Sequence, residues 1–348
     1  MRATLTPEQV EIQRTLREMA APGLRDARAC LEEGWRPTKV EGTLLSDFSA
    51  LGLPEEAGGF GTGMVEAVLA VEALARTLTP THLVGQLVAV HLAAAAGIDV
   101  RPAIEGGERW TPAVDEPDRL GLDDLDAAVG DGKARGEKAM VPVPGGALDA
   151  VVVVGRDGVG LVRGVRPEPA DSLDPSRPLG RMELDASVDG PVGEVGDGLS
   201  RAAVLVAADL CGAAAGALDL ATAYARDREQ FGRPIGSFQG VAFQLADAFT
   251  TIAEAWNLCL YAAWALDVRN DDAELVAHQA KASAGRAALF AAERCIQVHG
   301  GIGITMEADP HLFLRRALAG DAWIGQGRWH DRRAGALRVA ATLEGAQR

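Results

Sequence analysis

The longest apolar stretch of the chain runs from Ala202 to Tyr224, and the fold has to accommodate it. Its length would let it cross a bilayer, but Asp209 and Asp219 interrupt it, and placing both carboxylates in hydrocarbon would be costly. The N-terminal residues lead directly into charged side chains and show no apolar core of a signal peptide. We therefore expect a buried helix in a cytoplasmic protein without a membrane segment.

Charge and cysteine spacing exclude several classes of function. The 348 residues include 34 Lys and Arg against 49 Asp and Glu, which gives a net charge of −15 with neutral histidine. A binder of nucleic acid or of an anionic membrane surface needs a basic face, so we expect neither partner. The four cysteines form no CxxC pair, and no two histidines have HExxH spacing. We expect reduced, buried thiols and no metal site.

Helix and strand signals divide the chain into three parts, residues 1–110, 111–198 and 199–348. The first part predicts helices that begin with Thr6 as N-cap and Pro7 in the first turn. The second part predicts short strands between Gly, Pro and Asp turns, of which Gly130–Gly132 and Asp157–Gly158 suit hairpins. The last part predicts long helices again. The expected helices beyond the first cover about 41–51, 64–77, 81–96, 199–228, 237–268, 271–298 and 308–342.

Three segments together resemble the acyl-CoA dehydrogenase family. They are Arg226–Gln239 (RDREQFGRPIGSFQ), Gln297–Ile304 (QVHGGIGI) and Leu51–Gly61 (LGLPEEAGGFG). The resemblance spans nearly the whole chain and implies an α+β, mostly α fold. An N-terminal helical domain would be followed by a small central β-barrel or sandwich domain and a C-terminal four-helix bundle. It also implies FAD-dependent α,β-desaturation of an acyl-CoA.

The resemblance assigns a cofactor site to two of these segments. In the family, the first segment contacts the FAD of a neighbouring subunit, and the second lines the path of its adenine half. An arginine fork can grip a pyrophosphate, an aromatic ring offers a face to adenine or ribose, and glycines permit close backbone approach. Without the family, the same residues describe a helix–loop–helix turn with a solvated arginine. The residues that match the family's FAD contacts are Arg228, Phe231, Gln239, Gln297, Gly300, Gly301 and Gly303.

The chain departs from the family where the β domain begins. Members usually carry Thr-Glu-Pro followed by Gly-Ser-Asp, a stretch that helps to hold flavin and substrate. Here the corresponding stretch is Ala113–Arg119 (AVDEPDR), which keeps Glu116 and Pro117 but has no Gly-Ser-Asp. We therefore expect a weakened hold on the isoalloxazine end of this chain's own FAD.

The catalytic base is the second departure. Desaturation needs a carboxylate that removes the α-proton of the acyl group. Ungapped alignment puts Ile324 at the usual base position, and a two-residue shift puts Gln326 there. The family's alternative base position, on the first helix of the C-terminal domain, holds Ala202.

Two carboxylates near these positions were candidates for the missing base. Asp209 lies two turns beyond Ala202 among apolar residues, where desolvation should raise its pKa. Asp321 lies near the usual base loop, three positions from the match. For Asp209, the other interpretation is a structural carboxylate bonded to a neighbouring helix.

The leading hypothesis is a short, base-deficient subunit that completes the FAD site of a longer partner in an α2β2 assembly. Known short members of this type act on sterol side chains and similarly bulky acyl-CoA thioesters, and electron-transferring flavoprotein is the acceptor that the family implies. A second hypothesis is a self-sufficient homo-oligomeric dehydrogenase with Asp209 as base. A third is a non-catalytic scaffold of the same fold.

Overall fold

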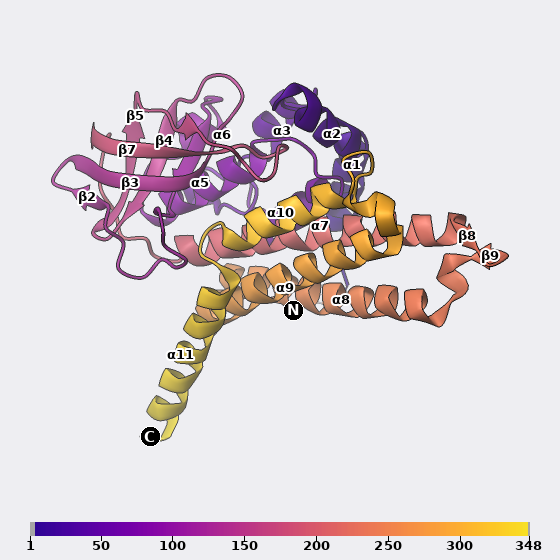
Figure 1. Ribbon diagram of the computed structural model, residues 1–348. Coiled ribbons are helices and arrows are strands. Elements are labelled where there is room, and N and C mark those ends of the chain that lie inside the picture. Colours follow the sequence, from indigo (N-terminus) through magenta and orange to yellow (C-terminus); the bar gives the residue numbers. More distant parts are fainter. Residues whose placement is uncertain (1–3, 347–348) are drawn as a thin grey trace.

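The computed structural model describes residues 4–346 as helices, then strands, then helices (Figure 1). The N-terminal elements are α1 (Pro7–Ala20), α2 (Gly23–Glu33), α3 (Glu41–Phe48), η1 (Glu55–Ala57), α4 (Met64–Ala75), α5 (Leu83–Ala95) and α6 (Arg101–Ile104). The middle strands are β1 (Trp110–Ala113), β2 (Ala128–Gly130), β3 (Lys133–Pro142), β4 (Ala150–Gly155), β5 (Gly158–Arg163), β6 (Glu168–Pro169) and β7 (Leu179–Ser187). The C-terminal elements are α7 (Gly198–Asp227), β8 (Glu229–Gln230), β9 (Arg233–Pro234), η2 (Ile235–Ser237), α8 (Gln239–Asp267), α9 (Ala273–His299), η3 (Gly300–Ile304), α10 (Pro310–Ala322) and α11 (Gly327–Ala346).

Local sequence explains most of the N-terminal helices. α1 begins with the predicted cap, because the Thr6 hydroxyl accepts from the Gln9 amide and the Gln9 side chain accepts from the Thr6 amide. The sequence did not predict α2, whose buried face consists only of Gly23, Ala27 and Cys30. Such small side chains give a weak apolar periodicity, although the helix is present.

The middle strands form two packed sheets, with orders β1-β4-β5 and β2-β3-β7-β6. A two-residue turn at Asp131 and Gly132, both with positive φ, joins β2 to β3, as the predicted hairpin requires. β4 is buried on both faces: Val151 and Val153 pack between the sheets, and Val152 and Val154 join the helical core. This double burial explains why β4 is a continuous valine run rather than an alternating one.

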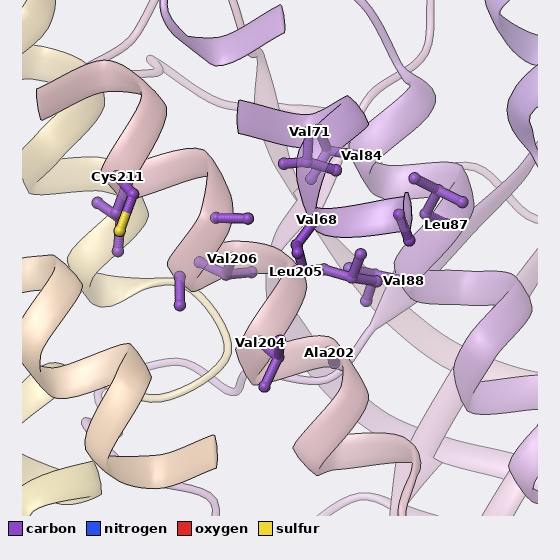
Figure 2. Packing of buried hydrophobic residues seen from close by; sticks show 14 of the residues in the cluster. Val68, Val71, Val84, Leu87, Val88, Ala202, Val204, Leu205, Val206 and Cys211 are labelled. Atoms are coloured by element: carbon purple, nitrogen blue, oxygen red, sulfur yellow. The ribbon is translucent and has the colours of Figure 1, made fainter. Parts of the chain in front are cut away.

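α7 is the central helix of the C-terminal part. It contains the stretch from Ala202 to Tyr224, is apolar enough and long enough to cross a membrane, and has 78% of its most apolar window buried within the protein. Side chains of α4 and α5, such as Val68 and Val88, lie beside Leu205 of α7 in one apolar cluster (Figure 2). The N-terminal and C-terminal helices therefore share one apolar core, and the expected buried helix is confirmed.

Candidate functional site

The two segments expected to contact FAD lie at the same end of the helical bundle. α8 returns along α7, so α7 and α9 finish on the same side, where the β8–β9 hairpin projects from the bundle (Figure 1). The ring of Tyr224, in the last turn of α7, stacks on the ring of His299, the last residue of α9. Their centroids are 4.1 Å apart, with an interplanar angle of 23°. Folding thus brings together segments that are about 70 residues apart in the chain.

The β8–β9 hairpin turns its aromatic side chain outward. Its tip is Phe231 and Gly232, both with positive φ, and the Phe231 side chain is 94% exposed. The Arg228 amide donates to the Tyr224 carbonyl at 2.8 Å, and the Ile235 amide donates to the Arg228 carbonyl at 2.8 Å. The hairpin is therefore tied to the end of α7, and Phe231 presents an open face to solvent.

Polar side chains beside the hairpin are also directed outward. Arg228, Gln239 and Gln297 are exposed, and within residues 4–346 their side chains have no hydrogen-bond or ion-pair partner. At Gly300 and Gly301 a Cβ atom would meet no other atom within 4 Å, so the backbone there is open to a ligand. Gly303 differs, because a Cβ there would press on the Ile296 carbonyl, and its glycine serves local packing.

Comparison with known proteins identifies the fold. The family model for the acyl-CoA dehydrogenase N-terminal domain matches residues 6–101, and the model for the C-terminal domain matches residues 195–332. The acyl-CoA dehydrogenase IpdE2 of Mycobacterium tuberculosis is 35% identical over 77% of this chain and 76% of its own length. The chain belongs to the acyl-CoA dehydrogenase family. Acyl-CoA dehydrogenases are FAD-dependent oxidoreductases, and the expected fold class is confirmed.

Further relatives include a much longer protein and two complexes. The acyl-CoA dehydrogenase FadE34 of Mycobacterium tuberculosis is 34% identical over 94% of this chain, which spans about half of that protein (48%). The ChsE4–ChsE5 complex of Mycobacterium tuberculosis matches with a TM-score of 0.82 and 25% identity, over 97% of this chain and 98% of that one. The Tcur3481–Tcur3483 steroid ACAD matches with a TM-score of 0.82 and 26% identity, over 98% and 100%.

The bundle end fits the adenine-side half of FAD. A guanidinium without a carboxylate partner suits a pyrophosphate, two free amides can pair with ribose or adenine, and Phe231 can cover a flat ring. Ile302 and Ile304, which are 44% and 76% exposed, add apolar surface in the turn that contains Gly300 and Gly301. These groups lie on an open surface of the protein.

The two positions matched to the catalytic base of acyl-CoA dehydrogenases are occupied by buried apolar residues in this chain. Ile324 and Ala202 are both 0% exposed. Both oxygens of the buried Asp115 carboxylate accept from the backbone, one from the Ile324 amide and one from the Gly325 amide, each at 2.9 Å. Burial raises the pKa of Asp115, which these amides and the charges of Lys281 and Lys138 oppose. The loop that usually presents the base is therefore fixed with an apolar side chain turned inward.

The segment that follows Ala113–Arg119 is bonded to this same loop. The Gln326 amide donates to the Leu120 carbonyl at 2.9 Å, and the Trp329 indole donates to the Asp123 carboxylate. The Trp329 ring packs so closely on Gly121 that a Cβ there would overlap it. Gly121 and Trp329 were not identified from the sequence. Neither belongs to a motif, and their role depends on the contact between them, which only the folded chain shows.

Glu116, which survives from the family motif, has a structural role. Its carboxylate accepts from the Asp126 and Ala127 amides, at 2.7 and 2.9 Å, and from Lys138 at 2.9 Å. Burial opposes the charge, but these bonds lower the pKa of Glu116 below its usual value. The retained carboxylate thus anchors the turn before β2 instead of facing a ligand.

The expected raised pKa of Asp209 is wrong. Arg177 donates to both carboxylate oxygens, at 2.5 and 2.7 Å, and Arg316 donates to Oδ1 at 3.1 Å. Burial would raise the pKa of Asp209, but the two guanidinium groups outweigh it and lower that pKa. Because Asp209 is 0% exposed and held by two cations, it is a structural carboxylate and cannot reach a substrate proton. The sequence contained one signal of this pairing, which was overlooked. Arg316 lies within the apolar segment of α10, where a buried arginine needs a carboxylate partner.

Asp321 is also enclosed. A Cβ at Gly285 or at Gly327 would press on its Oδ1 atom, so the carboxylate lies between the backbones of α9 and α11. Lys281, 0% exposed, donates to the Asp321 carbonyl at 3.0 Å and to the Gly325 carbonyl at 3.3 Å. Both of these aspartates therefore support the fold around the sealed loop.

An open cleft of 810 Å³ lies on the solvent side of this sealed region. Its walls come from the starts of α7, α9 and α11 and from the turn between α8 and α9. Four carboxylates face two arginines there, so the cleft repels a polyanion such as coenzyme A. The charged residues of the lining are Asp123, Asp197, Asp271, Glu274, Arg269 and Arg333.

Proposed function

We propose that this chain is a base-deficient subunit that completes the FAD site of a longer acyl-CoA dehydrogenase subunit in an α2β2 assembly. The assembly desaturates a bulky acyl-CoA thioester, of which a sterol side chain is the best-supported class. When bound, FAD supplies the acceptor for the hydride that leaves the acyl chain. Arg228, Phe231, Gln239, Gln297, Gly300, Gly301 and Gly303 are the proposed contacts of this chain with FAD, of which Gly303 contributes through local packing.

The observation that carries the proposal is the contrast between the two ends of the C-terminal bundle. At one end, Arg228 and its neighbours form an open donor surface with no internal partners among the described residues. At the other end, Ile324 and Ala202 are fully buried, and the Trp329 indole holds the segment around Asp123 against the start of α11. A chain built in this way can support a cofactor in a neighbour but cannot abstract a proton itself.

The comparisons support a heteromeric assembly and a steroid substrate. Two of the similar structures are complexes of two different subunits, ChsE4–ChsE5 and Tcur3481–Tcur3483, and the second is a steroid ACAD. The acidic cleft favours substrate binding by the longer partner rather than by this chain. The proposal locates the assembly in the cytoplasm, with electron-transferring flavoprotein as its electron acceptor.

The test is co-expression with a longer acyl-CoA dehydrogenase subunit, followed by measurement of the ratio of flavin to polypeptide. We expect a colourless chain alone and a yellow, active complex with about one FAD per two chains. If the chain alone bound FAD and reduced an acceptor with acyl-CoA, it would be self-sufficient and the proposal would fail. If no longer homologue bound the chain, the scaffold hypothesis would replace it.

Arg228→Ala tests the cofactor contact, with Arg226→Ala as a matched control. Loss of a charge-assisted contact should weaken FAD binding to the complex about 10- to 100-fold. Arg226 is likewise exposed but pairs with its neighbour Asp227 at 3.1 Å, so its removal should leave FAD binding unchanged. Equal effects of the two substitutions would contradict the assigned role of Arg228.

A further inference from the structure

Two aromatic rings join the elements that carry the proposed FAD contacts. His299 is buried, and its Nδ1 lies 2.8 Å from the Cys295 carbonyl. A carbonyl oxygen only accepts, so the His299 Nδ1 carries the proton and donates it. Burial lowers the pKa of His299, so the ring is neutral at pH 7. One fixed ring face therefore receives Tyr224 at a centroid distance of 4.1 Å.

Each ring is directly connected to one binding element. The Tyr224 carbonyl accepts the Arg228 amide, so the position of Tyr224 sets where the hairpin begins. His299 is followed by Gly300, whose φ is +64° and whose amide donates to the Ile296 and Gln297 carbonyls. Movement of the His299 ring would therefore shift the turn that carries Gln297 and the open glycine backbone.

The Tyr224–His299 stack lies at the C-terminal ends of α7 and α9, where a helix is held least firmly by its own hydrogen bonds. The carbonyl groups in the last turn of a helix have fewer intrahelical partners than those in its interior, and helix ends fray for that reason. The hairpin beyond Arg228 is largely exposed, so little packing on its own side fixes it. A contact that crosses between the two helix ends is the kind of contact that can hold their spacing.

We infer that Tyr224 and His299 are a positioning pair that sets the distance between the Arg228 hairpin and the Gln297 turn, and thereby the residence time of FAD. This inference rests on the proposed function. Neither ring needs to touch the cofactor. The pair acts by keeping the two contact elements in the arrangement that FAD requires, so less order has to be gained on binding.

The experiment measures FAD release from the purified complex with the longer subunit, through the rise in flavin fluorescence after dilution. Tyr224→Ala and His299→Ala should each speed release about 2- to 10-fold, the range that loss of one aromatic pair supports. Tyr224→Phe keeps the ring and should release FAD at the original rate. The double variant should be no faster than either single one, because both remove the same contact.

Tyr261→Ala is the matched control. Tyr261 lies near Trp264, with centroids 5.6 Å apart, close to the opposite end of the bundle on α8. Its removal should lower the melting temperature of the complex without changing FAD release. If Tyr224→Ala behaved in the same way, the pair would be merely structural and the inference would be overturned.

Two further measurements separate failure of the positioning pair from failed assembly and from failure of the proposed function. Should Tyr224→Ala fail to assemble, Tyr224→Leu keeps apolar volume without the stack and should still speed release; an unchanged rate would overturn the inference. Arg228→Ala in the same assay tests the proposed function. Faster release from Arg228→Ala together with unchanged release from the Tyr224 variants would reject only the positioning pair.

Discussion

Asp209 and Asp219 interrupt the same apolar helix, but their surroundings differ, and so do their contributions to the free energy of unfolding. Asp209 is 0% exposed, pairs with Arg177 and shares Arg316 with Asp174, in a buried group that joins the turn before β7, α7 and α10. Asp219 is 57% exposed and pairs with Arg76 at the surface. In the buried group each charge depends on its partners, because water cannot replace them.

Asp209→Asn should therefore destabilise the chain by about 3–5 kcal/mol, because two buried guanidinium groups lose their shared carboxylate. Asp219→Asn, on the same helix, should cost about 0–1 kcal/mol, since it breaks an exposed pair. Urea unfolding of both variants measures the difference, provided that the m-value stays constant. Similar midpoints for the two variants would contradict this account.

At the level of secondary-structure elements, the crossing of α4 and α7 depends on two glycines one turn apart. Gly212 and Gly216 face the backbone of α4, where an added Cβ would overlap the carbonyl oxygens of Glu72 and Arg76. Because the obstacle is backbone rather than a flexible side chain, the helices would have to move apart. The small residues of α7 thus determine how closely the N-terminal and C-terminal helices approach.

Gly216→Ala should destabilise the chain by about 1–3 kcal/mol, because the overlap outweighs the better helix propensity of alanine. Gly335→Ala in α11 is the control, since a Cβ there meets nothing within 4 Å. It should stabilise the helix by up to about 1 kcal/mol. Opposite signs in thermal unfolding support close packing at Gly216; the same sign would refute it.

At the scale of the whole molecule, buried histidines make the fold sensitive to acid. His82, His91, His278 and His330 are buried, and burial lowers the pKa of the first three to about 4 and that of His330 to about 2. Below pH 6.5 these histidines bind protons in the unfolded chain but stay neutral in the folded chain. The stability that the neutral rings contribute is therefore complete above pH 6.5 and is lost as the pH falls toward 4.

The melting temperature should accordingly fall between pH 7 and pH 5. Each histidine contributes up to about 1.4 kcal/mol per pH unit to this slope. Glu41, Asp115 and Asp267, whose pKa values burial raises, act in the opposite direction at the acidic end. Calorimetric scans across this range provide the measurement, and a flat profile would show that the histidines do not remain neutral in the folded chain.

Features that depend on neighbours along the chain could be predicted from the residues alone. The periodicity of residues 199–348 predicted long helices, and Asp131-Gly132 predicted a hairpin turn, because helix and turn preferences act over a few residues. The motif around Arg228 and the absence of a carboxylate at Ile324 and Ala202 were likewise readable as residue identities. α2 was missed because its buried face is made of small side chains that give little periodic signal.

Features that depend on segments far apart in the chain required the three-dimensional arrangement. Arg177 and Arg316 reach Asp209 from 32 and 107 residues away, and together they reverse the direction of its pKa shift. Trp329 closes on Gly121, and Tyr224 meets His299, through packing that no local pattern encodes. The balance between desolvation and pairing, and the spacing of two helix ends, arise from the approach of distant backbones, which is fixed only when the whole core forms.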